Sequence, residues 1–141
     1  MLNPFSVKAK TEAEEIFEKA SEYHEKEDLR NAISSYKKAI SLNPEFTEAY
    51  YNIGSIYFAQ KEYDLAIENY EKAISLNPNL TNTYFYLGIA YANKEEFDLA
   101  IKNYKKAIAL NPDFYNAYFH LGLVYANKQE RNSAIENYKK T

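Results

Sequence analysis

The side chains that could bind a metal ion or act as nucleophiles are few and scattered in this sequence. The two histidines, His24 and His120, lie far apart along the chain, and neither has a second histidine at the spacing that zinc ligands share. The chain contains no cysteine, which excludes thiolate ligands, nucleophilic thiols and disulfides. We therefore expect no metal site and no thiol chemistry.

Carboxylates are numerous, but their spacing is that of a solvated helix surface. Glu12, Glu14 and Glu15 stand together near the start of the chain, and such residues usually serve solubility and local ion pairing. The chain has only three glycines and no glycine-rich loop that could bind a phosphate group. We expect no catalytic and no cofactor-binding residues, and we predict that the protein is not an enzyme.

Composition and charge narrow the possible partners. With 141 residues, of which 46% are hydrophobic and 26% charged, the chain has the makeup of an ordinary soluble domain. A formal net charge of -3 provides no general attraction to nucleic acid or to anionic lipid, so neither is expected as a partner. No run of about 20 apolar residues could cross a membrane, and residues 1–10 lack the apolar core of a signal peptide. We predict a cytoplasmic protein.

An internal repeat organises the chain. The tripeptide Leu-Asn-Pro recurs, and the positions of Pro44, Pro78 and Pro112 define a constant 34-residue period. Aligning the chain at this period superposes two blocks of residues in each copy. The first block contains Gly54, Gly88 and Gly122, followed by Tyr57, Tyr91 and Tyr125, and the second block begins with Ala66, Ala100 and Ala134.

Each copy is predicted to be a pair of antiparallel α-helices, because the apolar positions recur at three and four residues and never alternate. In the second copy, the second helix is expected to begin near Asp64, a good N-cap residue, and to end at Asn77-Pro78; Asp98 and Asn132 are the equivalent starts. Proline stops a helix and asparagine tolerates the left-handed conformation, so this tripeptide should turn the chain into the next copy. Glycine within a helix costs about 1 kcal/mol relative to alanine, which predicts that the paired helix approaches closely at each glycine.

This pattern resembles the tetratricopeptide repeat (TPR) family over about residues 13 to 141. The resemblance implies an all-α fold, a right-handed α-solenoid (superhelix) of stacked antiparallel helix pairs, with about four 34-residue units in one continuous domain. The predicted divisions are residues 1–12 as an N-terminal tail or helix extension, then 13–46 (unit 1), 47–80 (unit 2), 81–114 (unit 3) and 115–141 (unit 4, truncated and without a C-terminal capping helix). A related family of RNA-binding repeats has a different period and is not favoured.

The turn inside each unit departs from the family pattern. The TPR family commonly has glycine there, whereas this chain has Glu27, Lys61, Glu95 and Gln129. We therefore expect these turns to be tight or strained. The repeated prolines, glycines, tyrosines and alanines are interpreted as packing residues that define the stack and indicate no ligand.

Function is expected on the concave side, which the first helix of each pair lines in the TPR family. One aromatic residue per unit, at positions 17, 51, 85 and 119, would form a row that could anchor an extended peptide or an amphipathic helix. The alternative is that this row packs against the neighbouring first helix and exposes only its edge. The candidate groove residues are Phe17, Tyr51, Asn52, Ser55, Asn82, Phe85, Tyr86, Ile89, Asn116, Phe119, His120 and Leu123.

The predicted function is that of a protein–protein interaction scaffold. Two alternatives remain open: head-to-tail self-assembly through the terminal units, since acidic residues crowd the first helix and basic residues the last unit, and a non-catalytic targeting region of a larger enzyme. Some TPR proteins hold the C-terminal carboxylate of heat-shock chaperones in a clamp of lysine, asparagine and arginine. The matching positions here include Phe17, Ser21 and Tyr86 and supply no cation, so no such chaperone-tail binding is expected.

Overall fold

Segments with helical apolar spacing fold into seven α-helices in the computed structural model, which describes residues 8–140. Within these residues there is no strand, and no helix is both long and apolar enough to span a membrane. The helices are α1 (Glu12–Glu25), α2 (Leu29–Leu42), α3 (Thr47–Ala59), α4 (Tyr63–Leu76), α5 (Thr81–Asn93), α6 (Phe97–Leu110) and α7 (Tyr115–Lys140).

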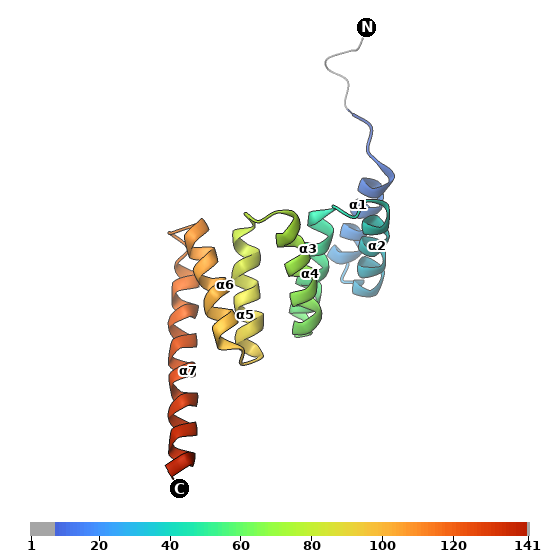
Figure 1. The fold of residues 1–141 in the computed structure, drawn as a ribbon. Coiled ribbons are helices and arrows are strands. Elements are labelled where there is room, and N and C mark those ends of the chain that lie inside the picture. Colours follow the sequence, from blue (N-terminus) through green and yellow to red (C-terminus); the bar gives the residue numbers. More distant parts are fainter. Residues whose placement is uncertain (1–7, 141) are drawn as a thin grey trace.

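The helices form a stack in chain order (Figure 1). The helices of each of the first three units pack against one another as α1 with α2, α3 with α4 and α5 with α6, and α6 then packs against α7. Between units, α2 contacts α3 and α4 contacts α5. The predicted all-helical solenoid is confirmed.

In each of these units, a buried tyrosine of the second helix packs against a small residue of the first helix. Tyr36, Tyr70 and Tyr104 are each only 1% exposed. A Cβ atom added at Gly54 would lie 2.7 Å from Cδ1 of Tyr70, and one added at Gly88 would lie 2.5 Å from Cδ1 of Tyr104. Since real Cβ atoms do not approach a ring so closely, only glycine fits at these two positions. The predicted close approach is therefore confirmed at both glycines.

The turns between units have a different conformation from the one expected. The asparagines before the prolines are extended, with φ values of -138° at Asn43, -139° at Asn77 and -138° at Asn111, so the expected left-handed conformation is wrong. A proline restricts the preceding residue to extended backbone, and that restriction decides the turn. Each asparagine side chain accepts a hydrogen bond from the backbone N–H two residues later, at Glu45, Asn79 and Asp113 respectively.

The left-handed residues lie in the turns inside the units. Glu27, Lys61 and Glu95 have φ values of 60°, 61° and 59°. Residues with a Cβ atom adopt this conformation at a cost of roughly 1–2 kcal/mol, so the expected strain is confirmed at these three turns. The packing of the helix pair on either side must offset this cost.

Two helices begin close to the predicted positions, but the predicted aspartates do not cap them. Helices α4 and α6 begin at Tyr63 and Phe97, one residue before the aspartates expected to cap them. Asp64 and Asp98 instead lie in the first turn, where a carboxylate still interacts favourably with the helix dipole. The turn before α4 closes when the N–H of Glu62 donates to the carbonyl of Tyr57, so the next residue already enters the helix.

Unit 4 does not form the helix pair expected from its sequence. Residues 115–140 are one continuous helix, α7 (Figure 1). Gln129, expected in a turn, is helical, and no new helix begins at Asn132. The packing role expected for Gly122, Tyr125 and Ala134 is therefore not found: no described residue lies within 4 Å of a Cβ built at Gly122, and the other two residues are exposed. A left-handed turn at Gln129 would carry the same strain as the other three, and a straight helix avoids it.

Candidate functional site

The aromatic row expected to line the groove is largely packed between units. The ring of Phe17 stacks on that of Phe46 with centroids 4.7 Å apart, and the ring of Phe85 lies 4.9 Å from that of Phe114. Phe46 and Phe114 are the last residues of units 1 and 3 and follow the Leu-Asn-Pro turn by two residues. At these two positions the row exposes little more than an edge, as in the alternative interpretation.

Unit 2 differs, because its last residue is Leu80 and not phenylalanine. Beside Leu80 and Tyr51 the surface opens into a cavity of about 480 Å³, which we call the Leu80 notch. It lies between the first turn of α3, the Leu-Asn-Pro turn after α4 and the first turn of α5. Its lining residues are Thr47, Glu48, Tyr51, Asn77, Asn79, Leu80, Thr81, Asn82 and Thr83.

The Leu80 notch is polar with little charge. Its polar groups are hydroxyls and side-chain amides, and Glu48 is its one charged residue. Thr83 is 1% exposed, and its Oγ1 has no hydrogen-bond partner among the described residues. Burial also raises the pKa of Tyr51, whose hydroxyl therefore stays protonated. Such a surface suits the neutral N–H and C=O groups of a peptide backbone.

Two of the polar candidates serve buried tyrosines. The hydroxyl of Tyr70 donates to Oγ of Ser55 at 3.1 Å, and Nδ2 of Asn52 donates to the hydroxyl of Tyr36 at 3.3 Å. A buried hydroxyl without a partner would destabilise the fold, so these contacts have a structural purpose. Asn52 and Ser55 are thus less available to a partner than their positions suggested.

The remaining candidates on α5 are half-buried. Tyr86 stacks on Tyr70 with ring centroids 6.1 Å apart and also meets Phe58 at 5.3 Å. Ile89 packs against the same core. These two residues are packed against the core, whereas Asn82 of α5 is exposed and lines the notch.

The candidates on α7 fall into two classes. His120 lies 5.1 Å from the ring of Phe85 and 5.9 Å from that of Tyr104, and burial lowers its pKa. Asn116, Phe119 and Leu123 are exposed, because no described helix covers this side of α7. The structure thus brings Tyr51 and Asn82 together at the notch and leaves the α7 residues outside it.

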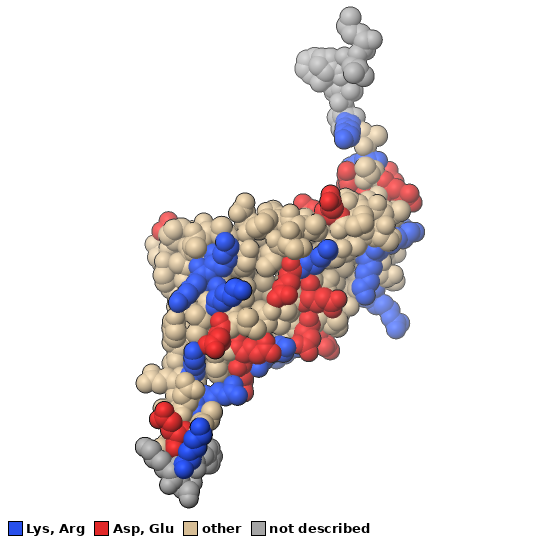
Figure 2. Space-filling model, in the orientation of Figure 1, with Lys and Arg blue, Asp and Glu red and all other residues tan. Residues whose placement is uncertain are grey.

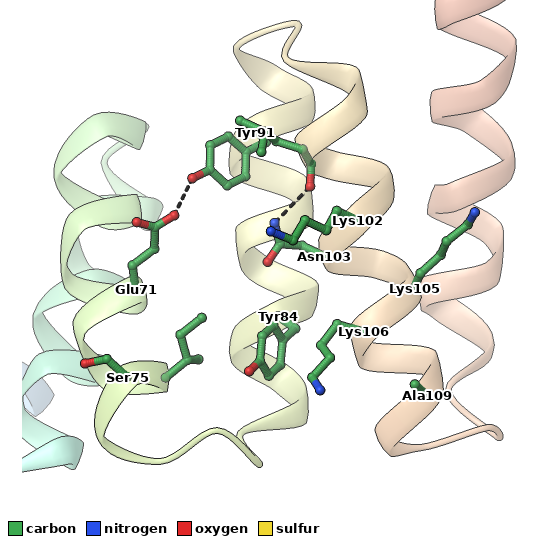
Figure 3. A pocket seen from close by; sticks show the side chains of 11 residues that line it. Glu71, Ser75, Tyr84, Tyr91, Lys102, Asn103, Lys105, Lys106 and Ala109 are labelled. Carbon is green, nitrogen blue, oxygen red and sulfur yellow. Dashed lines mark hydrogen bonds between the residues drawn. The ribbon is translucent and has the colours of Figure 1, made fainter.

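A second cavity, of about 770 Å³, lies between α4 and α6 over α5 (Figure 3). Tyr84 and Tyr91 line it from α5, and the Tyr91 hydroxyl donates a hydrogen bond to the Glu71 carboxylate. Burial, and then this hydrogen bond, raise the pKa of Tyr91. Lys102, Lys105 and Lys106 line the α6 side, and Nζ of Lys106 lies 5.9 Å from the centre of the Tyr84 ring.

The lysines of this second cavity were not among the sequence-based candidates. A signal was present, because Glu68 and Glu71 of unit 2 correspond to Lys102 and Lys105 of unit 3, one repeat period later. Figure 2 shows the outcome, with basic side chains gathered over α6 and acidic ones over α4 on the same face. Comparing the charges of equivalent positions would have found this surface.

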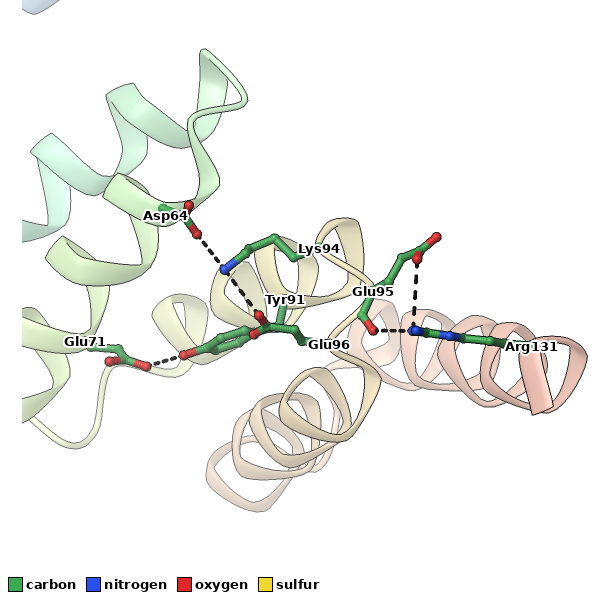
Figure 4. Close-up of polar contacts among 7 residues, drawn as sticks. All are labelled: Asp64, Glu71, Tyr91, Lys94, Glu95, Glu96 and Arg131. Carbon is green, nitrogen blue, oxygen red and sulfur yellow. Dashed lines mark hydrogen bonds and ion pairs between the residues drawn. The ribbon is translucent and has the colours of Figure 1, made fainter. Parts of the chain in front are cut away.

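Ion pairs join the turns of neighbouring units along one edge of the stack (Figure 4). Nζ of Lys94 lies 2.5 Å from Asp64 and 3.3 Å from Glu96. Arg131 donates to the backbone carbonyl of Glu95 at 3.2 Å. Within residues 8–140, no cluster of three or more histidine, aspartate or glutamate side chains is placed to bind a metal ion.

Solved structures of similar fold are numerous, and three indicate its relatives. A crystal structure of MamA is 35% identical, with a TM-score of 0.79 over 92% of this chain and 75% of that one. MamA 41-end from Desulfovibrio magneticus RS-1 is 26% identical, with a TM-score of 0.77 over 92% and 73%. The first TPR of Spaghetti (RPAP3) bound to the HSP90 peptide SRMEEVD is 25% identical, with a TM-score of 0.77 over 83% and 93%.

Family profiles agree with the repeat. A TPR repeat profile matches residues 20–61 and 90–129, and two tetratricopeptide repeat profiles match residues 47–80 and 69–102. A search of curated proteins gives no significant match. The profiles cover more than half of the chain, and the helix pairs, the 34-residue period and the glycine–tyrosine contacts agree with them. The chain belongs to the tetratricopeptide repeat family.

Proposed function

We propose that this TPR protein is a non-catalytic scaffold that binds an extended peptide segment of a partner protein, and that the Leu80 notch anchors it. The observation that carries the proposal is that a leucine in unit 2 replaces the phenylalanine that fills this space in units 1 and 3; we call that phenylalanine the plug. Phe46 and Phe114 fill the space beside the row in units 1 and 3, whereas Leu80 leaves a cavity beside Tyr51. The notch presents hydroxyls and amides next to one aromatic ring, which suits an uncharged backbone with a small side chain inserted.

One similar structure supports a peptide partner, and the residues of this chain limit the chemistry of that peptide. The Spaghetti TPR binds an acidic HSP90 peptide, SRMEEVD. In this chain, the positions expected for a carboxylate clamp include Phe17 and Tyr86, which are half-buried and stacked on neighbouring rings. The Leu80 notch contains Glu48 and no cation. We therefore propose that the partner segment is neutral or basic, and that SRMEEVD does not bind at micromolar concentrations.

The test is the substitution Leu80→Phe, which restores the plug present in the neighbouring units. Peptides would be selected from a displayed random library on the wild-type protein and their affinities measured by calorimetry or fluorescence anisotropy. The variant should remain folded, because the chain already accommodates phenylalanine at the equivalent positions 46 and 114. We expect it to weaken binding of the selected peptides at least tenfold, and Asn82→Ala to weaken it less.

The matched control is Leu65→Phe on α4, which makes the same substitution at an exposed leucine outside the notch. It should leave peptide affinity unchanged. Equal binding by wild type and Leu80→Phe would contradict the notch as the anchor. Micromolar binding of SRMEEVD would contradict the proposed charge preference.

The proposed compartment is the cytoplasm. The chain has no cysteine and therefore no disulfide that would require an oxidising compartment. Fractionation of the source cells followed by immunodetection tests it. Recovery in the cytosolic fraction is the expected result, and recovery outside it would overturn this part of the proposal.

Head-to-tail assembly is less favoured than the sequence suggested. Its basic surface in the last unit included Lys128 and Arg131, and both already interact with their own chain, at Asp98 and Glu95. The acidic residues of α1, such as Glu14 and Glu22, remain exposed. The charge complementarity between the ends is therefore weaker than a count of residues implies.

A further inference from the structure

Exposed apolar side chains concentrate on α7. Tyr118 and Tyr125 are 46% and 45% exposed, whereas their equivalents in unit 3, Tyr84 and Tyr91, are 8% exposed each. Outside α7, the large exposed apolar residues of the described chain are single leucines on α2, α4 and α6. A concentration of this kind on one helix marks an interaction surface. The exposed large apolar residues of α7 are Tyr115, Tyr118, Phe119, Leu123, Tyr125 and Ile135.

A specific contact is missing from this surface. In units 2 and 3 a tyrosine ring covers the glycine that precedes it by 16 residues, as Tyr70 covers Gly54. In the sequence of unit 4, the residue 16 positions after Gly122 is Tyr138, and none of the described side chains lies within 4 Å of a Cβ built at Gly122. Sixteen residues of straight helix span about 24 Å, so position 138 cannot reach position 122 of the same α7.

The open surface is preformed, because residues 115–128 occupy the place of an ordinary first helix. Ala117 and Val124 are buried against the preceding unit. Lys128 lies 2.6 Å from Asp98, which repeats, one period later, the pair of Lys94 and Asp64. The chain departs from the repeat only beyond Lys128. Residues 115–128 therefore present the same surface on which the second helix packs in the other units.

The distal half of α7, residues 130–140, is a second helix without its partner. Ala134 and Ile135 are exposed, whereas the equivalent Ala100 of unit 3 is fully buried. The sequence from Ala134 to Tyr138 has the same spacing as the sequence from Ala100 to Tyr104. Each copy of the chain therefore carries both halves of a helix pair and, because α7 is straight, cannot join them.

We propose that two copies of this chain exchange the distal halves of α7. The distal half of each copy would lie antiparallel on residues 115–128 of the other, around a two-fold axis near Gln129 and Glu130. A second copy fits this surface because it supplies the segment whose register matches the glycine. Both contacts are equivalent, so the assembly closes as a dimer and does not extend into a filament. It also buries Tyr118 and Tyr125 without requiring a strained turn at Gln129.

The proposal is independent of peptide binding. The Leu80 notch lies between α3 and α5, and none of its lining residues belongs to α7. A dimer of this kind would present two notches to one partner or to two. Loss of the dimer by a change in α7 should leave peptide affinity at the notch unchanged, so failure of either proposal is distinguishable from failure of the other.

Disulfide trapping tests the exchange directly, because the natural chain has no cysteine. The double variant Gly122→Cys with Tyr138→Cys would be oxidised and run on a non-reducing gel. The control is Gly54→Cys with Tyr70→Cys, where a Cβ at Gly54 lies 3.2 Å from Cγ of Tyr70 and the pair closes within one chain. This approach is compatible with the Cβ separation of about 3.5–4.5 Å in disulfides.

We expect a covalent dimer from the first variant and a covalent monomer with an internal bond from the control. An internal bond in the first variant would show that α7 bends back on itself and would overturn the exchange. Reduced thiols in the first variant, with an oxidised control, would show that the two positions never meet and would overturn it as well.

Light scattering of the wild type supplies a second measurement without any disulfide. The mass should rise with concentration to that of a dimer and stop there. Ala134→Glu should keep the helical circular dichroism spectrum, because the residue is exposed in the single chain, and should lose the dimer. A wild type that remains monomeric at every concentration, or one that grows beyond a dimer, would contradict the proposal.

Discussion

Units 3 and 4 carry the same repeat motifs and fold differently. In residues 81–114, Gly88 meets Tyr104 and two helices of 13 and 14 residues pack together. In residues 115–140, Gly122 meets nothing and one helix of 26 residues continues through the position of the turn. The motif is therefore not sufficient to form the pair.

The difference lies in the neighbours of each unit. Helices α5 and α6 of unit 3 have α4 on one side and α7 on the other, so both their faces are covered. Among the described residues, a helix pair formed from α7 would have α6 on one side and no helix on the other. Because a repeat protein is stabilised by contacts between adjacent repeats, the gain from closing such a pair is smaller, while the strained turn costs the same. The comparison predicts that matched substitutions in the two units have unequal or opposite effects.

The largest difference is expected for tyrosine deletion. Tyr104→Ala removes a ring that is 1% exposed and should lower the free energy of unfolding by about 3–5 kcal/mol. Tyr125→Ala removes a half-exposed ring and should cost less than about 1 kcal/mol. Urea denaturation at a concentration where light scattering gives the mass of a single chain provides both values. Similar losses for the two variants would contradict the assignment of unit 3 as packed and α7 as open.

Substitution of glycine by alanine should change sign between the units. Gly88→Ala places a Cβ atom against the ring of Tyr104, and overpacking of this kind costs about 1–3 kcal/mol, more than the helix gains. Gly122→Ala adds a methyl group in open space and should stabilise the helix by about 0.5–1 kcal/mol. Thermal unfolding followed by circular dichroism, at a concentration where light scattering gives the mass of a single chain, measures both shifts. A loss of stability in Gly122→Ala would mean that a ring already covers this glycine.

Substitution by glycine in the turns should also have opposite effects. Lys61 has a φ of 61°, so Lys61→Gly relieves a left-handed residue and should raise stability by up to about 1 kcal/mol. Gln129 is helical, so Gln129→Gly should lower stability by about 1 kcal/mol. The same denaturation experiment compares them. If Gln129→Gly were stabilising, residue 129 would be in a left-handed turn and α7 would not be continuous.

A smaller effect is expected at high pH. Burial raises the pKa of Tyr104 above its ordinary value of 10.0, so the unfolded chain loses this proton first as the pH rises. The stability due to neutral Tyr104 is therefore complete below pH 10 and declines above it. Tyr104→Phe removes the titrating hydroxyl and with it this contribution to the pH dependence of stability. Between pH 9 and pH 11 the variant should lose less stability than the wild type, and an equal loss in both would contradict the burial of this hydroxyl.

Much of the architecture could be predicted from local pattern. The prolines at 34-residue intervals defined the units, and the mid-helix glycines predicted the contacts later found at Gly54 and Gly88. The non-glycine turns at Lys61 and Glu95 predicted strain, and both residues are left-handed. These features depend on residues within one unit, which the pattern of that unit describes.

The remaining features depend on contacts between units. The straight course of α7 follows from a balance between a strained turn and a face that no described helix covers, and no motif within residues 115–140 indicates that balance. The Leu80 notch exists because Leu80 replaces a plug formed by Phe46 and Phe114 in the other units. That difference is visible in the sequence once the packing partner of each row residue is known. The groove candidates were drawn equally from all the units, so the sequence pattern did not distinguish unit 2 from its neighbours.

The most direct test is a pair of distance measurements by electron paramagnetic resonance on equivalent positions. Spin labels would be attached to Asn116→Cys with Asn137→Cys, and separately to Asn82→Cys with Asn103→Cys, the equivalent positions of the preceding unit. In each pair the labels are 21 residues apart, which is about 32 Å along a continuous helix. We predict about this distance between backbones for the first pair and a clearly shorter one for the second, where the helices are antiparallel. The labelled protein would be diluted with an excess of unlabelled chain, so that only distances within one copy are recorded. Equally short distances in both pairs would then show that unit 4 is closed like unit 3, and would contradict the account.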